Sequence, residues 1–139
     1  ASNVQARKKA TKIKQALESD SPDLEELNNK LKRLNILEFV GQPLSDVKFP
    51  DELNLLTGVN YIDISCSDLK EVPNFIFMLD NISILNLRNN KFEKLPEDLC
   101  NMKNLNRVDI LLNPIKEVPV NMSKFIHDLP YMAKWAPSC

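Results

Sequence analysis

Glycine is scarce in this sequence, and Gly41 and Gly58 are the only two among 139 residues. Loops that hold phosphate groups in nucleotide-binding proteins need several glycines at fixed spacing, because the backbone there must approach the phosphates closely. The sequence contains neither the P-loop pattern nor the dinucleotide-binding pattern. We therefore expect no nucleotide cofactor.

Long apolar runs are missing as well. A helix that crosses a bilayer needs roughly 20 consecutive apolar residues, and no stretch of the sequence comes near that length. The opening residues, ASNVQARKK, lack the apolar segment of a secretory signal peptide. We expect a protein without a membrane span.

Cysteine and histidine are few and scattered. The cysteines are Cys66, Cys100 and Cys139, and His127 is the single histidine. Their spacing matches no zinc site, and none has a sequence neighbour that indicates activation as a nucleophile. We expect no metal ion and no enzyme activity. An odd number of scattered cysteines also favours a reducing compartment.

What the sequence does have is an internal repeat. The segments 59–79, 82–102 and 105–125 place apolar residues at equivalent positions with a stride of 23 residues. In each copy these residues first alternate, as in a strand, and then follow at wider steps, which is typical of one turn of a repeating structure. The matched positions are Val59, Ile62, Ile64, Ser67, Leu69, Val72, Pro73, Ile76 and Leu79; Ile82, Leu85, Leu87, Asn90, Phe92, Leu95, Pro96, Leu99 and Met102; and Leu105, Val108, Ile110, Asn113, Ile115, Val118, Pro119, Met122 and Phe125.

A looser copy, 34–56, precedes these three, and its link to Phe49-Pro50 is about two residues longer. The pattern resembles the leucine-rich repeat, L-x-x-L-x-L-x-x-N-x-L. The added LP-x-x-L/I resembles the repeats of Ras suppressor, Ras-pathway scaffold and Scribble-type polarity proteins. This resemblance implies a scaffold or adaptor in an intracellular signalling, polarity or enzyme-regulatory complex. Secreted members of the class resemble one another in having cysteine clusters that cap each end, and this sequence lacks them. We therefore expect a cytoplasmic or nuclear location.

We expect an α/β leucine-rich repeat solenoid with four repeats over residues 34–125. Each L-x-x-L-x-L segment should form a short strand with alternate side chains inward, and successive strands should pair in parallel on the concave face. Asn90 and Asn113 should bond to the backbone of adjacent coils, whereas Gln42 and Ser67 fill this position less well. Each proline can open a short helical or 3₁₀ segment on the convex side. The expected core residues are Ile62, Ile64, Leu85, Leu87, Val108 and Ile110 from strands, and Ile76, Leu99 and Met122 from convex segments.

Both ends of such a stack need a cover, because one coil cannot bury its own apolar face. Residues 1–33 predict a helical N-terminal cap, with a basic amphipathic helix, a break at 20–22 and a second helix that Ser21 caps. In that second helix, Leu24, Leu27 and Leu31 follow helical spacing. Residues 126–139 predict either a C-terminal cap or a tail with a docking surface. The apolar residues available near this end are Phe125, Ile126, Leu129, Tyr131, Met132 and Trp135.

The strand positions between the leucines should align across the coils on the concave face. Apolar, aromatic and arginine side chains carry most of the energy at interfaces, and neighbouring acidic or amide groups chiefly set specificity. The alternative is that Arg88 only neutralises Asp63 and Asp109, in exposed pairs worth about 0–1 kcal/mol each. The expected binding residues for a protein partner are Glu38, Tyr61, Asp63, Ile84, Asn86, Arg88, Arg107, Asp109 and Leu111.

A second hypothesis places function at the ends of the chain. Residues 1–33 carry a net charge of +3 and the remainder −4, so the run from Arg7 to Lys14 suggests an assembly subunit that docks through its basic helix or its apolar tail, onto protein or nucleic acid. Nucleic acid is disfavoured, because no aromatic residue lies among the basic ones to stack on bases. Asn81-Ile82-Ser83 and Asn121-Met122-Ser123 match the N-glycosylation triplet, and we interpret both as accidental.

Overall fold

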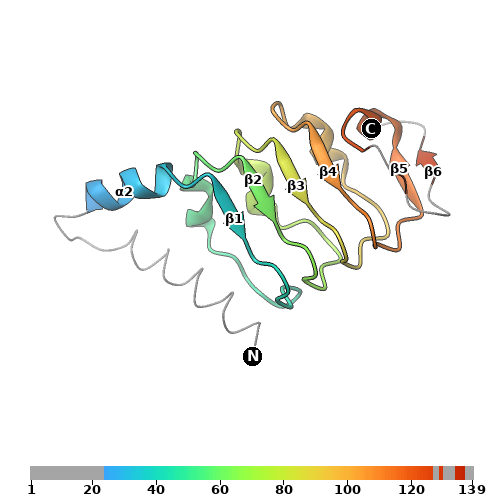
Figure 1. Ribbon diagram of the computed structural model, residues 1–139, viewed down its shortest axis with the longest axis horizontal. Coiled ribbons are helices and arrows are strands. Elements are labelled where there is room, and N and C mark those ends of the chain that lie inside the picture. The colour runs from blue at the N-terminus through green and yellow to red at the C-terminus, as the bar shows by residue number, and fades with distance from the viewer. Residues whose placement is uncertain (1–23, 127–128, 130–133, 137–139) are drawn as a thin grey trace.

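Four parallel strands, stacked side by side, form the framework of the molecule (Figure 1). The structure is a computed structural model that describes residues 24–126, 129 and 134–136. The sheet has the order β1-β2-β3-β4, so each repeat adds one strand beside the previous one. These strands are β1 Ile36–Glu38, β2 Tyr61–Asp63, β3 Ile84–Asn86 and β4 Arg107–Asp109.

The strands form where the sequence alternates, and the alternation decides which side chains enter the core. The central residue of every strand is buried, from Leu37 in β1 to Val108 in β4. The residues two positions further on are buried as well, which confirms the inward direction predicted for both positions. They are Phe39, Ile64, Leu87 and Ile110.

Short 3₁₀ helices form the second layer, behind the sheet in Figure 1. Each one follows directly after the proline of its repeat, so the proline occupies the cap position immediately before the helix. The buried side chains Ile76, Leu99 and Met122 reach the core from this layer, as predicted. The helices are η1 Asp51–Leu55, η2 Asn74–Met78, η3 Glu97–Asn101 and η4 Val120–Lys124.

Asparagine side chains join successive coils where the chain leaves the sheet. The buried Asn90 accepts hydrogen bonds from the N–H groups of Ser67 and Leu69, both at 3.0 Å, and donates to the carbonyl oxygen of Ile64 at 2.9 Å. Asn113 bonds in the same way to the coil of Asn90. Such buried backbone groups need partners, because the core gives them no water.

The first half of this ladder is weaker, as the sequence predicted. The Ser67 hydroxyl donates to the carbonyl oxygens of Phe39 and Ser65, and its side chain accepts no backbone N–H from the described residues. In the first coil, the side-chain oxygen Oε1 of Gln42 is buried and makes no hydrogen bond within the described part of the chain. The ladder therefore strengthens from the first coil to the last.

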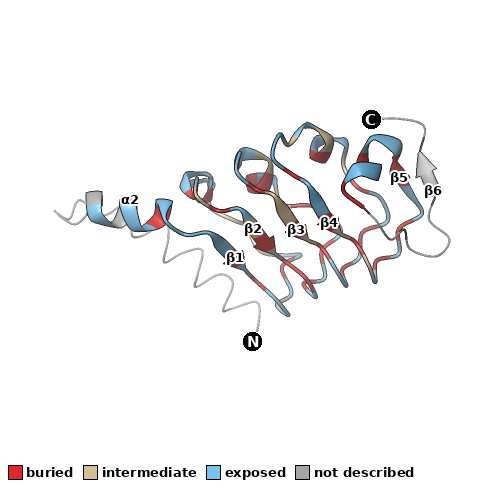
Figure 2. Cartoon of the chain, turned by 45° about the horizontal axis from the view of Figure 1, so that its top comes forward, coloured by how far each residue is buried: buried red, intermediate tan, exposed pale blue. Residues whose placement is uncertain are grey.

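A helix lies at the start of the stack. Helix α2 spans Leu24–Lys32 and is stabilised by an ion pair between Lys30 and Glu26 at 3.3 Å. Leu31, near its C-terminal end, is buried in the common core. Among the helix residues whose burial is described, Glu26, Asn29, Lys30 and Lys32 are exposed. A buried stretch lies at the C-terminal end of α2, where the helix meets the repeats (Figure 2). The remainder of the predicted cap, including Ser21 and the basic run, lies outside the described residues, so the cap as a whole stays a prediction.

Glycine at position 58 lets the second coil approach this helix closely. A Cβ atom at Gly58 would overlap the carbonyl oxygen of Lys32 and come within 3.2 Å of the carbonyl oxygen of Leu34. No side chain fits between these backbones, so the absence of a Cβ fixes where α2 meets the repeats.

At the other end, Phe125 and Ile126 continue the core, and Leu129 packs against it. The carbonyl oxygen of Phe125 accepts a hydrogen bond from Val108 N–H at 3.2 Å, and so pairs the outer edge of β4. A separate parallel pair joins β5, Glu117–Pro119, to β6, Lys134–Ala136. Tyr131 and Met132, and the side chain of Trp135, lie outside the described part of the chain.

Candidate interaction surface

The concave face presents two columns of side chains in strict register. Ile36, Tyr61, Ile84 and Arg107 stand beside one another on the four strands, and so do Glu38, Asp63, Asn86 and Asp109. The structure thus brings the predicted residues together on one surface. Whether a partner binds them stays a prediction. Exposed among the nine are Glu38, Arg88 and Arg107; half-buried are Tyr61, Asp63, Ile84, Asn86, Asp109 and Leu111.

Three members of the Glu38 column, namely Asp63, Asn86 and Asp109, also stabilise local turns. Asp63 Oδ1 accepts the N–H of Ser65 at 3.0 Å, Asn86 Oδ1 that of Arg88 at 3.0 Å, and Asp109 Oδ1 that of Leu111 at 3.1 Å. Each bond closes a turn two residues long, a conformation that Asp and Asn side chains favour. In Asp63 and Asp109 this bond uses only Oδ1. It holds the carboxylate in position, while the second oxygen and the negative charge face the surface.

Arg88 confirms part of the alternative interpretation. Its guanidinium lies 3.8 Å from Asp109 Oδ2, in a partly exposed pair. No ion pair joins it to Asp63 among the described residues. A loose exposed pair of this kind adds about 0–1 kcal/mol, and Asp63 keeps its charge available to a partner.

An apolar strip runs along the N-terminal half of the concave face. Ile36 is 55% exposed, and Tyr61 and Ile84 beside it are half-buried. Val40, on the same side of the first coil, is 46% exposed. Aligned apolar side chains on neighbouring strands make a surface that an apolar partner can cover.

A further column of the concave face has left-handed backbone, a conformation that the sequence prediction did not anticipate. Gly41, Cys66, Asn89 and Leu112 all have positive φ, between 54° and 73°. Glycine and asparagine adopt this conformation readily, whereas leucine is a clear outlier. Leu112 is also 64% exposed. Glycine and asparagine at two of these positions are compatible with positive φ, but cysteine and leucine at the other two gave no such signal.

Leu112 is therefore a further candidate for the site. Strained backbone at an exposed residue persists only where the surrounding structure imposes it. Here the N–H of Asn89 donates to the carbonyl oxygen of Leu111 at 2.9 Å, which holds the turn in place. The result is a leucine side chain held in solvent beside the half-buried Leu111.

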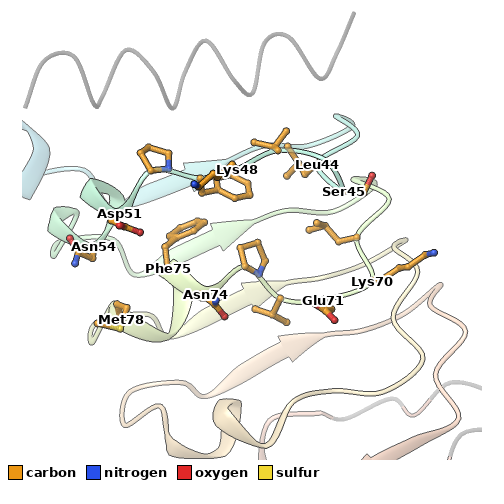
Figure 3. A pocket seen from close by; sticks show the side chains of 16 residues that line it. Leu44, Ser45, Lys48, Asp51, Asn54, Lys70, Glu71, Asn74, Phe75 and Met78 are labelled. Carbon is orange, nitrogen blue, oxygen red and sulfur yellow. The ribbon is translucent and has the colours of Figure 1, made fainter.

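A groove on another side of the molecule contains none of the predicted residues. It has a volume of about 960 Å³ and lies along the links that lead from the sheet to η1 and η2 (Figure 3). The rings of Phe49 and Phe75, with centroids 5.1 Å apart, form its apolar part. Lys48, Asp51 and Lys70 stand around them. The groove has charged side chains of both signs, and its polar groups do not converge on one point. It therefore indicates no particular class of ligand.

Other candidate features fall outside the described residues or give no site. His127, Cys139 and the basic run 7–14 belong to the part of the chain that is not described. Within the described part, no three His, Cys, Asp or Glu side chains cluster as metal ligands would. No helix in that part is long and apolar enough to cross a bilayer.

Cysteine usage differs from what the sequence suggested. Cys100, in η3, is disulfide-bonded, while Cys66 is a free, exposed thiol whose Sγ accepts a contact from Asn89 Nδ2 at 3.3 Å. Disulfides persist in oxidising compartments. A disulfide at Cys100 does not fit the expectation of a reducing compartment, which rested on the number and spacing of the cysteines. The cytoplasmic or nuclear location stays an untested prediction.

These features define the class of fold. A parallel strand from each repeat, an asparagine ladder and a convex 3₁₀ layer form a leucine-rich repeat solenoid. The comparison with solved structures agrees: the leucine-rich repeat protein LIC12759 of Leptospira interrogans matches with a TM-score of 0.56 and 20% identity, over 90% of this chain. This chain covers 37% of the length of that one. At this level of identity the likeness shows the fold alone.

Comparison by sequence adds no family. No protein-family model matches the chain, and no curated protein matches it.

Proposed function

We propose that this chain is a protein-interaction module that binds a partner on the concave face of sheet β1–β4. The proposal depends on one observation: Ile36, Tyr61 and Ile84 align on neighbouring strands, next to the aligned column that contains Asp63. Aromatic and apolar side chains at the centre of a surface, with charged groups beside them, are the usual composition of a binding site for protein.

The charges on this face favour a partner with a matching pattern. Coils one and two carry Glu38 and Asp63, a charge of −2, whereas coils three and four carry Arg88, Arg107 and Asp109, a charge of +1. A partner with basic groups over the first two coils and acidic groups over the last two would be attracted in one orientation only. Complementary charge of this kind sets orientation and specificity more than affinity.

Leu111 and Leu112 extend the surface at its far end. Leu112 is exposed on a turn with φ 59°, where a leucine is strained. An exposed apolar side chain on strained backbone fits the role of an anchor in a partner's apolar pocket. We include Leu112 in the proposed interface for this reason.

The proposed role is scaffolding or adaptor work without catalysis. The repeat type suggests this role, and the concave acidic groups support it, because Asp63 and Asp109 already accept backbone N–H groups in their turns. Carboxylates that are held in position by these bonds are suited to binding basic groups of a partner protein. The resemblance implied that this role is performed in intracellular complexes. The disulfide at Cys100 does not favour that location.

The experiment is an affinity capture from cells that make the protein, with quantitative mass spectrometry of the captured proteins. The concave variant combines Asp63→Asn, Arg107→Glu and Asp109→Asn. It leaves the net charge unchanged, and each asparagine keeps the oxygen that accepts the N–H of Ser65 or Leu111. We expect about tenfold less capture of the partner, because complementary charges become neutral or repulsive.

A matched variant on the convex side controls for general effects. Glu97→Gln, Asp98→Asn and Lys103→Glu alter three exposed residues in and after η3, again without a change of net charge. This variant should capture the partner as well as the wild type does. Equal capture by the concave variant, or an equal loss in both variants, would overturn the proposal.

A further inference from the structure

The triplet Asn121-Met122-Ser123 lies in η4 and presents its acceptor side chain to solvent. Met122 is fully buried in the core, whereas Asn121 and Ser123 on either side of it are exposed. The side-chain amide of Asn121 makes no hydrogen bond within the described part of the chain. The triplet therefore has the accessibility that a modified asparagine needs.

The second triplet, at Asn81, is different. Asn81 Nδ2 donates to the carbonyl oxygen of Thr57 in the preceding coil at 2.6 Å. Asn104 makes the equivalent bond to Asp80 one coil further on, at 2.7 Å. The amide of Asn81 is thus part of a ladder that joins coils, and a sugar on Nδ2 would stand in that junction.

An independent observation, the disulfide at Cys100, supports modification of the triplet. Cys100 is disulfide-bonded, and disulfides form in oxidising compartments such as the secretory pathway. N-glycans are added to Asn-x-Ser/Thr triplets of secreted chains. A chain that acquires this disulfide there is exposed to the glycan-transferring machinery of the same route.

We infer that Asn121 is an N-glycosylation site, modified by an oligosaccharide from a polyisoprenyl diphosphate donor. In this transfer a bond forms between Asn121 Nδ2 and the anomeric C1 of the sugar, and the bond between C1 and the diphosphate oxygen breaks. The amide nitrogen loses one proton, and the polyisoprenyl diphosphate leaves with the bonding electron pair. No oxidation or reduction takes place.

The position of Asn121 is compatible with partner binding on the sheet. Helix η4 belongs to the 3₁₀ layer and packs against η3, and this layer lies on the opposite side of the coils from β1–β4 (Figure 1). A bulky, hydrated glycan there would cover the convex side and leave the concave columns accessible. The inference goes beyond the proposed function and does not depend on it.

The test measures the protein made by its own cells, from its complete gene with an affinity tag. Intact mass and gel mobility are compared before and after treatment with an amidase that releases N-glycans and converts the acceptor asparagine to aspartate. The wild type should lose mass and gain an aspartate at residue 121. Asn121→Gln and Ser123→Ala should show no mass loss, and both alter exposed side chains, so the fold should be retained.

Ser83→Ala is the matched control, because it removes the other triplet and leaves Asn81 bonded to Thr57. This variant should lose the same mass as the wild type does. A wild-type protein without N-glycan, or a glycan that persists in Asn121→Gln, would overturn the inference. Partner capture by Asn121→Gln should equal that of the wild type, so failure of the glycan inference and failure of the concave-face proposal are distinguishable.

Discussion

At the scale of single residues, buried asparagines hold neighbouring coils together. The Asn90 side chain accepts two backbone N–H groups and donates its two N–H groups to the carbonyl oxygens of Ile64 and Leu87, and the residue is 3% exposed. A serine at the equivalent position, Ser67, has one hydroxyl proton, which the carbonyl oxygens of Phe39 and Ser65 share. The amide is effective because it has donors and acceptors in one plane.

Replacement of this asparagine should be costly. Asn90→Ala leaves the buried N–H groups of Ser67 and Leu69 without partners, and each unsatisfied buried group costs about 1–3 kcal/mol. We expect the free energy of unfolding, measured by urea denaturation, to fall by roughly 3 kcal/mol. Asn106→Ala, at an exposed position, should change it by less than about 0.5 kcal/mol. Similar losses in the two variants would contradict the ladder's importance.

Leu112 provides a second prediction at this scale, in which stability and binding change in opposite directions. Leu112→Asn places a residue that tolerates positive φ at a backbone angle of 59° and removes an exposed side chain. The free energy of unfolding should rise by about 0.5–1 kcal/mol, while partner capture decreases. Leu111→Asn, which has no positive φ, should bring no gain in stability. A loss of stability in Leu112→Asn would show that its backbone is not strained.

At the scale of elements, the junction between α2 and the repeats depends on a close backbone approach. The N–H groups of Arg33 and Leu34 bond to the carbonyl oxygens of Lys30 and Leu31, at 3.1 and 3.2 Å, where the helix ends. Gly58 lies directly against this segment. The helix is thus placed by the second coil as well as by the first.

Gly58→Ala should disturb this junction selectively. The added methyl group overlaps backbone atoms of Lys32, so the helix must move, and overpacking of this kind costs about 1–3 kcal/mol. Amide hydrogen exchange should become faster at Arg33 and Leu34. Gly41→Ala is the comparison: its Cβ would meet nothing within 4 Å, and only its φ of 73° is unfavourable. That variant should leave exchange at the end of α2 unchanged.

At the scale of the whole molecule, stability comes from stacking, because each coil buries its apolar side chains against its neighbours. One continuous core runs from Leu31 to Ile126. Cys100, in η3, forms a disulfide, which adds a covalent link to this packing. A disulfide reduces the conformational entropy of the unfolded chain and so raises the free energy of unfolding. All coils that unfold cooperatively share this stabilisation.

Reduction of this disulfide should therefore be visible in global unfolding. We expect a thiol reductant to lower the free energy of unfolding by roughly 2–4 kcal/mol, measured by chemical denaturation. Cys100→Ser should show the same loss and no further response to reductant. Cys66→Ser, at a free and exposed thiol, should behave like the wild type. Stability that is independent of reductant in the wild type would show that the link does not stabilise the fold.

Much of the fold was predictable because the repeat encodes contacts between equivalent positions. The register of Tyr61 with Ile84, the burial of Leu85 and Leu87, and the bonds of Asn90 all follow from the stride and the alternation. The candidate binding columns follow from the same register. Their turns were not predicted, because the bond from the Ser65 N–H to Asp63 depends on how the strand ends.

The sequence by itself determined the stride, and with it the stacking of strands, the core and the asparagine ladder, because each of these links a residue to its counterpart in the next coil. Tertiary structure alone decided the left-handed turn at Leu112, the approach of Gly58 to Lys32 and the disulfide of Cys100. These features arise where segments without a shared pattern meet or where packing imposes a backbone angle. The repeat pattern does not specify the close approach of Gly58 or the disulfide of Cys100, and a leucine at position 112 gives no indication of positive φ.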